Sequence, residues 1–216
     1  MKKSISIFFL ALLYMLCLCD SSFSQGKLYH VKWVDDGDTI VLSDGRRIRY
    51  IGINAPETDH FKNGNKTQRG ERFGQHAKKY NEKLVHLKKV RLEFDHEKYD
   101  RYGRLLAYVF LKDNSFINEK IVQAGLAYCL SIKPNLHYSS RLLKAQRGAI
   151  AQRKNIWKKL ENKKGAFVGN QKSMRFHLPS CQFGKKTAQK NRVAFKTVYD
   201  AFYMGFAPCM KCRPNP

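Results

Sequence analysis

Three short segments of this 216-residue chain bring acidic and arginine side chains together around a predicted hairpin. They are residues 35–39 (DDGDT), 49–57 (RYIGINAPE) and 100–104 (DRYGR). Hydrolysis of a phosphodiester requires positive charge that holds the phosphate and a base that positions the attacking water. The three segments contain residues of both kinds. Taken together, in this order, they predict a site that cleaves phosphodiesters.

The side chains in these segments fall into two chemical groups. Asp38, Asn54 and Glu57 offer oxygen ligands of the kind that Ca²⁺ prefers. Arg49 and Arg104 can each direct two donors onto phosphate oxygens. Strand periodicity puts both arginines on otherwise apolar strand faces, which favours a functional site. A structural ion pair between Arg49 and Asp38 is the alternative interpretation.

Short strands must position these groups. Alternating or continuous apolar patterns predict strands at residues 29–34, 39–42, 46–53, 90–94 and 104–111. The Asp-Gly pair at residues 44–45 predicts a hairpin turn between the second and third of them. The polar residues 63–70 predict a loop.

Helical patterns lie between and after the strands. Ala77, Tyr80, Leu84 and Leu87 recur at helical spacing. Further helices are predicted over residues 116–125 and from Ser139 or Ser140 onward. Because strands come first and show no strict alternation with helices, the pattern predicts an α+β fold with a small barrel.

The three segments resemble the thermonuclease family, also called staphylococcal-nuclease-like domains. The resemblance runs over residues 28–157 and includes the Lys-Pro-Asn loop at 133–135 and the ending at 155–157. It implies a five-stranded OB-type β-barrel with about three helices. It also implies hydrolysis of DNA and/or RNA that leaves a 3′-phosphate and a free 5′-hydroxyl.

The resemblance further implies a catalytic Ca²⁺ site. Asp38 would be a direct ligand, with Asp35 in the shell behind it, and the backbone carbonyl of Ala55 would be another ligand. Asn54 stands where the family has its second carboxylate ligand. An amide oxygen still ligates Ca²⁺ but brings no charge, so weaker binding is expected.

The same resemblance assigns the remaining roles. Glu57 would be the general base, or at least the group that positions water. Arg49 and Arg104 would bind the scissile phosphate and stabilise its developing charge.

The stretch before the Lys-Pro-Asn loop departs from the family pattern. There the family has two tyrosines that contact the nucleotide, whereas this chain has Leu130 and Ile132 near those positions. We expect Tyr128 or Tyr138 to provide the stacking surface instead.

A second unit is expected at residues 168–216, after a basic linker at 158–167. His177 and Cys181 form His-x₃-Cys, and Cys209 and Cys212 form Cys-x₂-Cys, a set of four suited to structural Zn²⁺. A unit this small needs such a staple, although a disulfide is the alternative. The unit resembles the zinc-binding module of Ada-type DNA-repair proteins. There a methyl-accepting cysteine stands where this chain has His177, so the resemblance implies structural zinc and a basic nucleic-acid-facing surface.

The first 24 residues have the pattern of a secretory signal peptide. Two lysines precede a 14-residue apolar run, and small residues place the cleavage after Ser24. Lipoprotein anchoring through Cys19 and an uncleaved anchor are alternatives. The pattern predicts a secreted or periplasmic protein with no stable membrane association after cleavage.

The charge predicts the partner. Forty-one Lys and Arg residues against 17 Asp and Glu give a formal net charge of +24, which indicates a polyanion such as nucleic acid. The 43% hydrophobic fraction excludes a disordered tail protein. We expect a monomeric, secreted, Ca²⁺-dependent nuclease acting on DNA and/or RNA. The alternatives are a catalytically silent nuclease-like binding module and a basic binder of acidic glycans.

Overall fold

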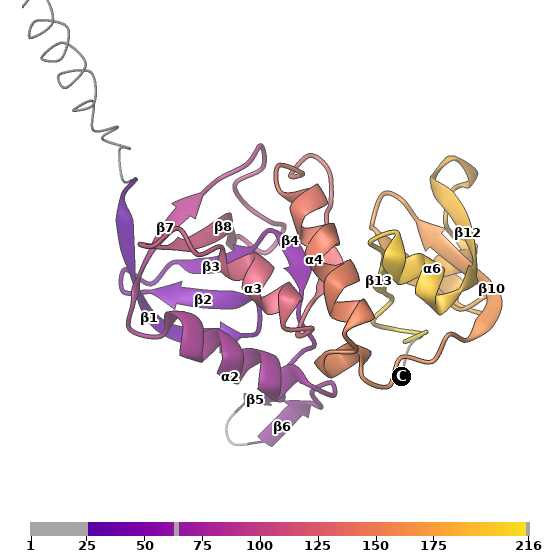
Figure 1. The fold of residues 1–216 in the computed structure, drawn as a ribbon, viewed down its shortest axis with the longest axis horizontal. Helices are drawn as coiled ribbons and strands as arrows, with labels where there is room; N and C mark the ends of the chain where they lie inside the picture. The colour runs from indigo at the N-terminus through magenta and orange to yellow at the C-terminus, as the bar shows by residue number, and fades with distance from the viewer. Residues whose placement is uncertain (1–25, 63–64, 215–216) are drawn as a thin grey trace, which may run out of the picture.

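The computed structural model describes residues 26–62 and 65–214, so the predicted signal peptide lies outside the described residues. A β-barrel with three helices stands beside a smaller unit built on a four-stranded sheet (Figure 1). Within the described ranges, no helix combines the length and the apolar character needed to cross a membrane.

Five strands close the barrel in the order β1-β2-β3-β8-β7. Their bounds are β1 (Leu28–Asp36), β2 (Thr39–Leu42), β3 (Arg47–Tyr50), β8 (Leu105–Leu111) and β7 (Lys89–Glu93). The β3–β8 pair is parallel, the other four are antiparallel, and β1 pairing with β7 completes the ring. Val31, Ile40 and Ile48 fill the interior with no exposed surface. The predicted five-stranded barrel is thereby confirmed.

Three helices pack on the barrel: α2 (Gly74–Val85), α3 (Ile117–Gln123) and α4 (Ser139–Ala151). Ala77 of α2 is fully buried, and Tyr80 and Leu84 pack partly buried against the same core, as the helical spacing predicts. Leu87 departs from that pattern, because α2 ends at Val85 and Leu87 is left-handed (φ 56°) and 65% exposed. The spacing alone cannot show where the chain leaves the helix.

The strand predicted over residues 46–53 is broken at Ile51. β3 ends at Tyr50, and β4 (Gly52–Asn54) leaves the barrel to pair antiparallel with β9 (Tyr128–Leu130). Gly52 has φ 79°, and a Cβ there would lie 2.5 Å from Leu142, so the break requires glycine. This turn directs Asn54 toward the start of β2.

The loop predicted at residues 63–70 is wrong in part, because the segment forms a hairpin. β5 (His60–Lys62) pairs antiparallel with β6 (Asn65–Gln68), and residues 63–64 between them lie outside the described residues. A two-stranded ribbon outside the core needs no apolar alternation, so its sequence has the composition of a loop.

The second unit carries a sheet in the order β12-β10-β11-β13. Its elements are β10 (Lys164–Asn170), β11 (Arg175–His177), α5 (Gln182–Lys185), η2 (Gln189–Asn191), β12 (Arg192–Thr197), α6 (Val198–Tyr203) and β13 (Ala207–Pro208). The short helix η1 (Asn155–Trp157) precedes the sheet. β10 begins inside the segment predicted as a linker.

A shared core joins the two units. The end of α4, η1 and the small sheet contribute to one buried cluster, in which Trp157 and Phe202 have ring centroids 4.9 Å apart. Buried Gln146 of α4 donates from Nε2 to the Phe202 carbonyl (2.6 Å), and its Oε1 accepts from the Cys129 backbone N–H (2.7 Å). α4, which lies between the units in Figure 1, therefore holds them in one arrangement.

Candidate active site and zinc site

Two aspartates flank the turn between β1 and β2. Asp36 ends β1, and Asp38, 6% exposed, precedes β2. A Cβ on Gly37 between them would lie 2.6 Å from the methyl group of Ala55, so glycine permits this close approach. Asn81 of α2 donates to the Asp36 carbonyl (3.1 Å) and fixes the turn against the helix.

Asp36, Asp38 and Glu57 form a crowded acidic group. Burial, followed by the charge of Asp38, raises the pKa of Asp36 to about 7. Burial and Asp38 also raise the pKa of Glu57, while a hydrogen bond with Asp36 opposes the rise. A positive charge that joins this group would favour the ionised forms of Asp36 and Glu57.

Asp38 and Asn54 are bridged by Arg49. The Arg49 Nη2 lies 3.0 Å from Asp38 Oδ2 and 3.4 Å from Asn54 Oδ1, and the Ala55 backbone N–H donates to Asp38 Oδ2 (2.6 Å). The ion pair considered as an alternative is therefore present. It also anchors Arg49 at the acidic group.

Arg104 reaches the same region from the loop before β8. Its Nε donates to Asp100 Oδ2 (2.7 Å), and Asp100 Oδ1 accepts from the Arg104 and Tyr102 backbone N–H groups, both at 2.9 Å. Asp100 thereby orients the guanidinium of Arg104.

One cleft of about 930 Å³ collects these groups. Five side chains singled out from the sequence line it: Asp38, Arg49, Asn54, Glu57 and Arg104. Ala55 is buried beside it, and its carbonyl accepts from Asn54 Nδ2 (3.3 Å). The potential metal ligands of the acidic group are all oxygen atoms, which fits a hard cation such as Ca²⁺.

Asp35 does not lie in this cleft. Its carboxylate pairs with Arg47, and Asp36 is the residue that lies with Asp38 and Glu57. The resemblance therefore placed this role one residue too early. Gly37 is the signal that could have identified Asp36, because the tight turn brings together the two aspartates that flank it.

The two tyrosines expected to stack on bases have other partners. Tyr128 stacks on Phe202 of the second unit, with ring centroids 5.5 Å apart and 9° between planes. Tyr138 donates its hydroxyl to Glu93 (2.7 Å). Neither lines the cleft, although Tyr128 lines the adjoining pocket described below, so a stacking role for either ring stays a prediction.

Tyr99 and Tyr102 line the cleft instead. They are 64% and 68% exposed, and the guanidinium carbon of Arg104 lies 5.6 Å from the centroid of the Tyr102 ring. Exposed aromatic rings beside a charged cleft are suited to stacking on nucleobases. Tyr102 stands inside the 100–104 segment, so the sequence did contain its signal.

The second unit contributes Ser173, Arg175 and Met210 to the same cleft. Arg175, the first residue of β11, donates from Nη2 to Asn54 Oδ1 (3.2 Å) and from Nη1 to the Pro208 carbonyl (2.8 Å). Burial, with the charge of Arg49, lowers the pKa of its guanidinium. Sequence reasoning missed Arg175.

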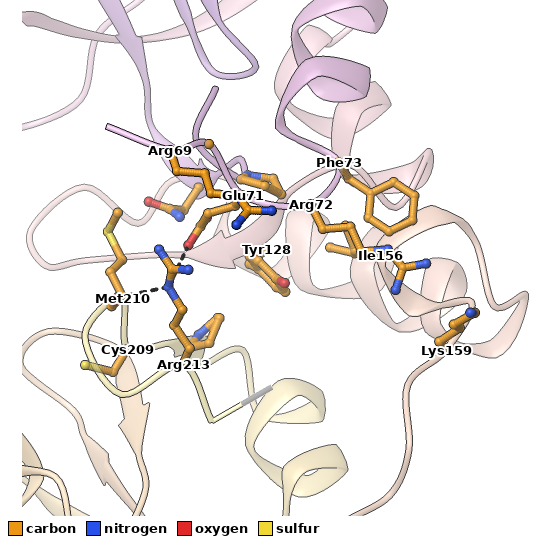
Figure 2. A pocket seen from close by; sticks show the side chains of 14 residues that line it. Arg69, Glu71, Arg72, Phe73, Tyr128, Ile156, Lys159, Cys209, Met210 and Arg213 are labelled. Atoms are coloured by element: carbon orange, nitrogen blue, oxygen red, sulfur yellow. Dashed lines mark hydrogen bonds and ion pairs between the residues drawn. The ribbon is translucent and has the colours of Figure 1, made fainter. Parts of the chain in front are cut away.

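A second pocket of about 410 Å³ lies between the two units (Figure 2). Its lining is basic, with Arg69 and Arg72 from the barrel unit, Lys159 from the segment that follows it and Arg213 from the second unit. Arg213 Nε lies 3.8 Å from the carboxylate of Glu71 across the pocket. Both pockets are lined by Asn54 and Met210, so they adjoin. A polyanion therefore meets positive charge along both.

The four predicted zinc ligands converge at one point of the second unit. The ligand atoms of His177, Cys181, Cys209 and Cys212 all lie within 4.8 Å of one another. They come from the end of β11, the residue before α5 and the segment after β13. All are free thiols or imidazole, and burial lowers the pKa of His177 and favours its neutral, metal-binding form. The set fits tetrahedral zinc.

Comparisons with known proteins agree with both sites. A family model described as staphylococcal nuclease homologue matches residues 47–159, and one described as metal binding domain of Ada matches residues 154–215. A thermonuclease of Staphylococcus hyicus is 41% identical over 134 residues, covering 61% of this chain and 76% of that protein. A thermonuclease of Staphylococcus intermedius is 40% identical over 138 residues, with 62% and 79% covered.

A more distant relative is the SPbeta prophage-derived endonuclease YokF of Bacillus subtilis (strain 168). It is 37% identical over 129 residues, which cover 57% of this chain and 42% of that protein. The nuclease relatives support nuclease activity. The metal-binding match, together with the four converging ligands, supports zinc in the second unit.

Proposed function

The chain belongs to the staphylococcal nuclease family, and on that premise we propose that it is a secreted, Ca²⁺-dependent nuclease that leaves 3′-phosphate ends on DNA or RNA. The observation that carries this proposal is the convergence of Glu57, Arg49 and Arg104 on one cleft. A base and two phosphate-binding arginines are the groups that hydrolysis of a phosphodiester requires.

Glu57 is the proposed base. Burial and Asp38 raise its pKa, which brings the carboxylate closer to the working pH and makes it a better proton acceptor. A water beside Glu57 loses its proton to the carboxylate as its oxygen attacks phosphorus. The bond to the 5′ oxygen breaks, and that oxygen takes up a proton as the 5′-hydroxyl.

The arginines hold the phosphate. Arg49 is fixed by Asp38, and Arg104 is oriented by Asp100, so each presents donors in a set direction. Ca²⁺ held by Asp38, Asn54 and the Ala55 carbonyl would supply further positive charge against the phosphate. The structural zinc of the second unit would be held by His177 and the three cysteines.

Exposed rings and basic pockets support nucleic acid as the substrate. Tyr99 and Tyr102 border the cleft, and the basic pocket of Figure 2 adjoins it. We further propose the organisation predicted from the sequence: a signal peptide at 1–24, a nuclease unit at 28–157, a linker at 158–167 and a module at 168–216. Cleavage after Ser24 predicts a mature chain that begins at Gln25, which intact mass measures.

The test is turnover of Glu57→Gln. With millimolar Ca²⁺, the wild-type chain should cleave single- or double-stranded DNA or RNA and leave 3′-phosphates, and a chelator should stop it. Glu57→Gln should lose about 10²–10⁴-fold in rate, while Glu82→Gln on α2, outside the cleft lining, should match wild type. Equal turnover of Glu57→Gln and wild type would remove Glu57 from the mechanism.

A catalytically silent binding module is the second candidate. It is favoured by Asn54, which supplies a neutral amide where the family has a carboxylate, and by the guanidinium of Arg175 beside that amide. This candidate predicts nucleic-acid binding with no cleavage by the wild-type chain. Cleavage that disappears in Glu57→Gln would exclude it.

A further inference from the structure

We propose that Arg175, from the second unit, is a third phosphate-binding arginine of the cleft. The proposal rests on the proposed function and deepens it, because it makes the second unit part of the substrate site. Its ligand is a phosphodiester of the bound nucleic acid.

The position of the guanidinium comes first. Arg175 Nη2 lies 3.2 Å from Asn54 Oδ1, and Arg49 Nη2 lies 3.4 Å from the same oxygen. Two guanidinium groups, one from each unit, therefore converge on a single atom in the cleft. Such a pair matches the several oxygens of one phosphate.

The charge of Arg175 lacks a fixed partner. Arg49 and Arg104 pair with Asp38 and Asp100, but among the ion pairs of the described residues none includes Arg175. Its hydrogen bonds to Asn54 and Pro208 go to neutral oxygens. A partly buried guanidinium in this state is stabilised when an anion enters.

Asn54 explains why the partner is missing. A carboxylate at residue 54 would form an ion pair with Arg175, since the amide oxygen is already within hydrogen-bond distance. The neutral amide keeps Arg175 in place without cancelling its charge. Asparagine at this position thus leaves a positive charge available to the substrate.

The second unit holds Arg175 firmly. β11 pairs with β13 so that Arg175 lies opposite Ala207, and the Pro208 carbonyl accepts from Nη1. The core shared around Trp157 and Phe202 fixes this sheet against the barrel unit. Because the side chain of Arg175 is already held in place, little conformational entropy is lost when phosphate binds.

The first measurement is binding without turnover. Affinity for a short single-stranded oligothymidylate is measured by fluorescence anisotropy in Ca²⁺-free buffer without a chelator, so that zinc stays bound, across a series of salt concentrations. Arg175→Ala should bind about 10–100-fold more weakly, and the slope of log affinity against log salt should fall by about 0.7. Arg175→Lys keeps the positive charge but loses the two-donor geometry of the guanidinium, so its affinity should be intermediate. Lys196→Ala, an exposed charge of the same unit outside the cleft lining, should change affinity by less than about threefold.

The second measurement is kcat/KM with Ca²⁺, where Arg175→Ala should lose about tenfold or more. Zinc content of one per chain in every variant shows that the second unit is intact. Binding and kcat/KM equal to those of Lys196→Ala would overturn the proposal, and so would faster cleavage by Arg175→Ala, which would mean that Arg175 blocks the cleft. If the wild-type chain does not cleave but Arg175→Ala still loses affinity, the proposed function fails and the phosphate role of Arg175 stands.

Discussion

The barrel unit and the second unit each gather potential metal ligands, in opposite ways. The barrel's oxygens line a cleft of about 930 Å³ and are already bridged by arginines, whereas the thiols and imidazole of the second unit close on one point. An open, charged site leaves room for a substrate, and a closed one leaves none. This difference fits the catalytic role proposed for the first site and the structural role proposed for the second.

The two units also differ in what holds them together. The barrel has its own apolar core and a closed ring of strands. The second unit is a small sheet whose aromatic side chains pack against α4 and η1. We therefore expect its stability to depend on its neighbour and on zinc.

Removal of zinc should produce the largest difference between the two units, because it should unfold the second unit and leave the barrel folded. Zinc binding supplies about 10–16 kcal/mol to zinc-finger peptides, so a strong zinc chelator should open the second unit and expose its three ligand cysteines to alkylation. Cys129 should stay protected, because burial raises the pKa of its thiol to about 12. Omitting Ca²⁺ alone should expose none of the four.

Mass spectrometry after alkylation at pH 8 counts the modified cysteines. Labelling of Cys129 together with the other three would show that the two units unfold together, which would contradict the difference in stability expected between them. No labelling after zinc removal would show that zinc is not the staple.

Arg104→Ala should cost activity without costing stability. Loss of a donor to the developing charge typically lowers turnover about 10²-fold, and the barrel core lies elsewhere. The matched control is Arg141→Ala on α4, whose guanidinium pairs with Glu119 outside the cleft lining. Turnover by Arg104→Ala within threefold of that control would contradict the assignment.

Asn54→Asp should strengthen Ca²⁺ binding in the barrel without affecting zinc in the second unit. The added carboxylate charge should lower the Ca²⁺ midpoint about tenfold and leave zinc content unchanged. The shift should be larger in an Arg175→Ala background, where only Arg49 still competes for the new charge. A Ca²⁺ midpoint that does not move in either background would remove Asn54 from the ligand set.

Acid should destabilise the second unit before the barrel. Burial alone would raise the pKa of Asp95. Its carboxylate accepts hydrogen bonds from the His137 and His96 backbone N–H groups and from the Tyr108 hydroxyl, and these lower the pKa below 3.8. A depressed carboxyl pKa contributes stability above the unfolded value of about 4, and that stability is lost as pH falls through the folded value. Zinc thiolates are protonated and release the metal at higher pH.

Asp95→Asn should therefore lower the unfolding free energy of the barrel by about 1 kcal/mol at pH 7, and the difference should shrink as pH falls from 7 through the folded pKa of Asp95. Urea titrations followed by a barrel-specific signal measure it. A constant difference across this pH range would mean that ionisation of Asp95 is not involved.

The sequence was informative wherever the relevant signal was local. Strand alternation and helical spacing predicted the barrel and its three helices, and the Cys-x₂-Cys and His-x₃-Cys spacings predicted residues that do converge. The break after Tyr50 was missed because the apolar run continues through it, and only Gly52 marks the turn.

The rest of the cleft depends on contacts that no local pattern encodes. Arg175 and Asn54 are 121 positions apart, and nothing around residue 175 indicates a phosphate site. Tyr128 was expected to stack on bases because its type and place in the chain suit that role. Its ring instead stacks on Phe202, a residue of the other unit, and lines the adjoining pocket rather than the cleft. Tertiary packing thus decided which aromatic rings stay exposed.

The hydrogen bonds of Gln146 and the aromatic contact between Trp157 and Phe202 have a consequence for proteolysis. A single peptide-bond cut in the exposed stretch at residues 161–163 would nick the chain without releasing a fragment, because the two pieces would stay associated like subunits of a heterodimer. Such a nicked protein would migrate as two bands under denaturing conditions and as one particle under native ones. The boundary between the units therefore separates two family matches rather than two mechanically independent bodies.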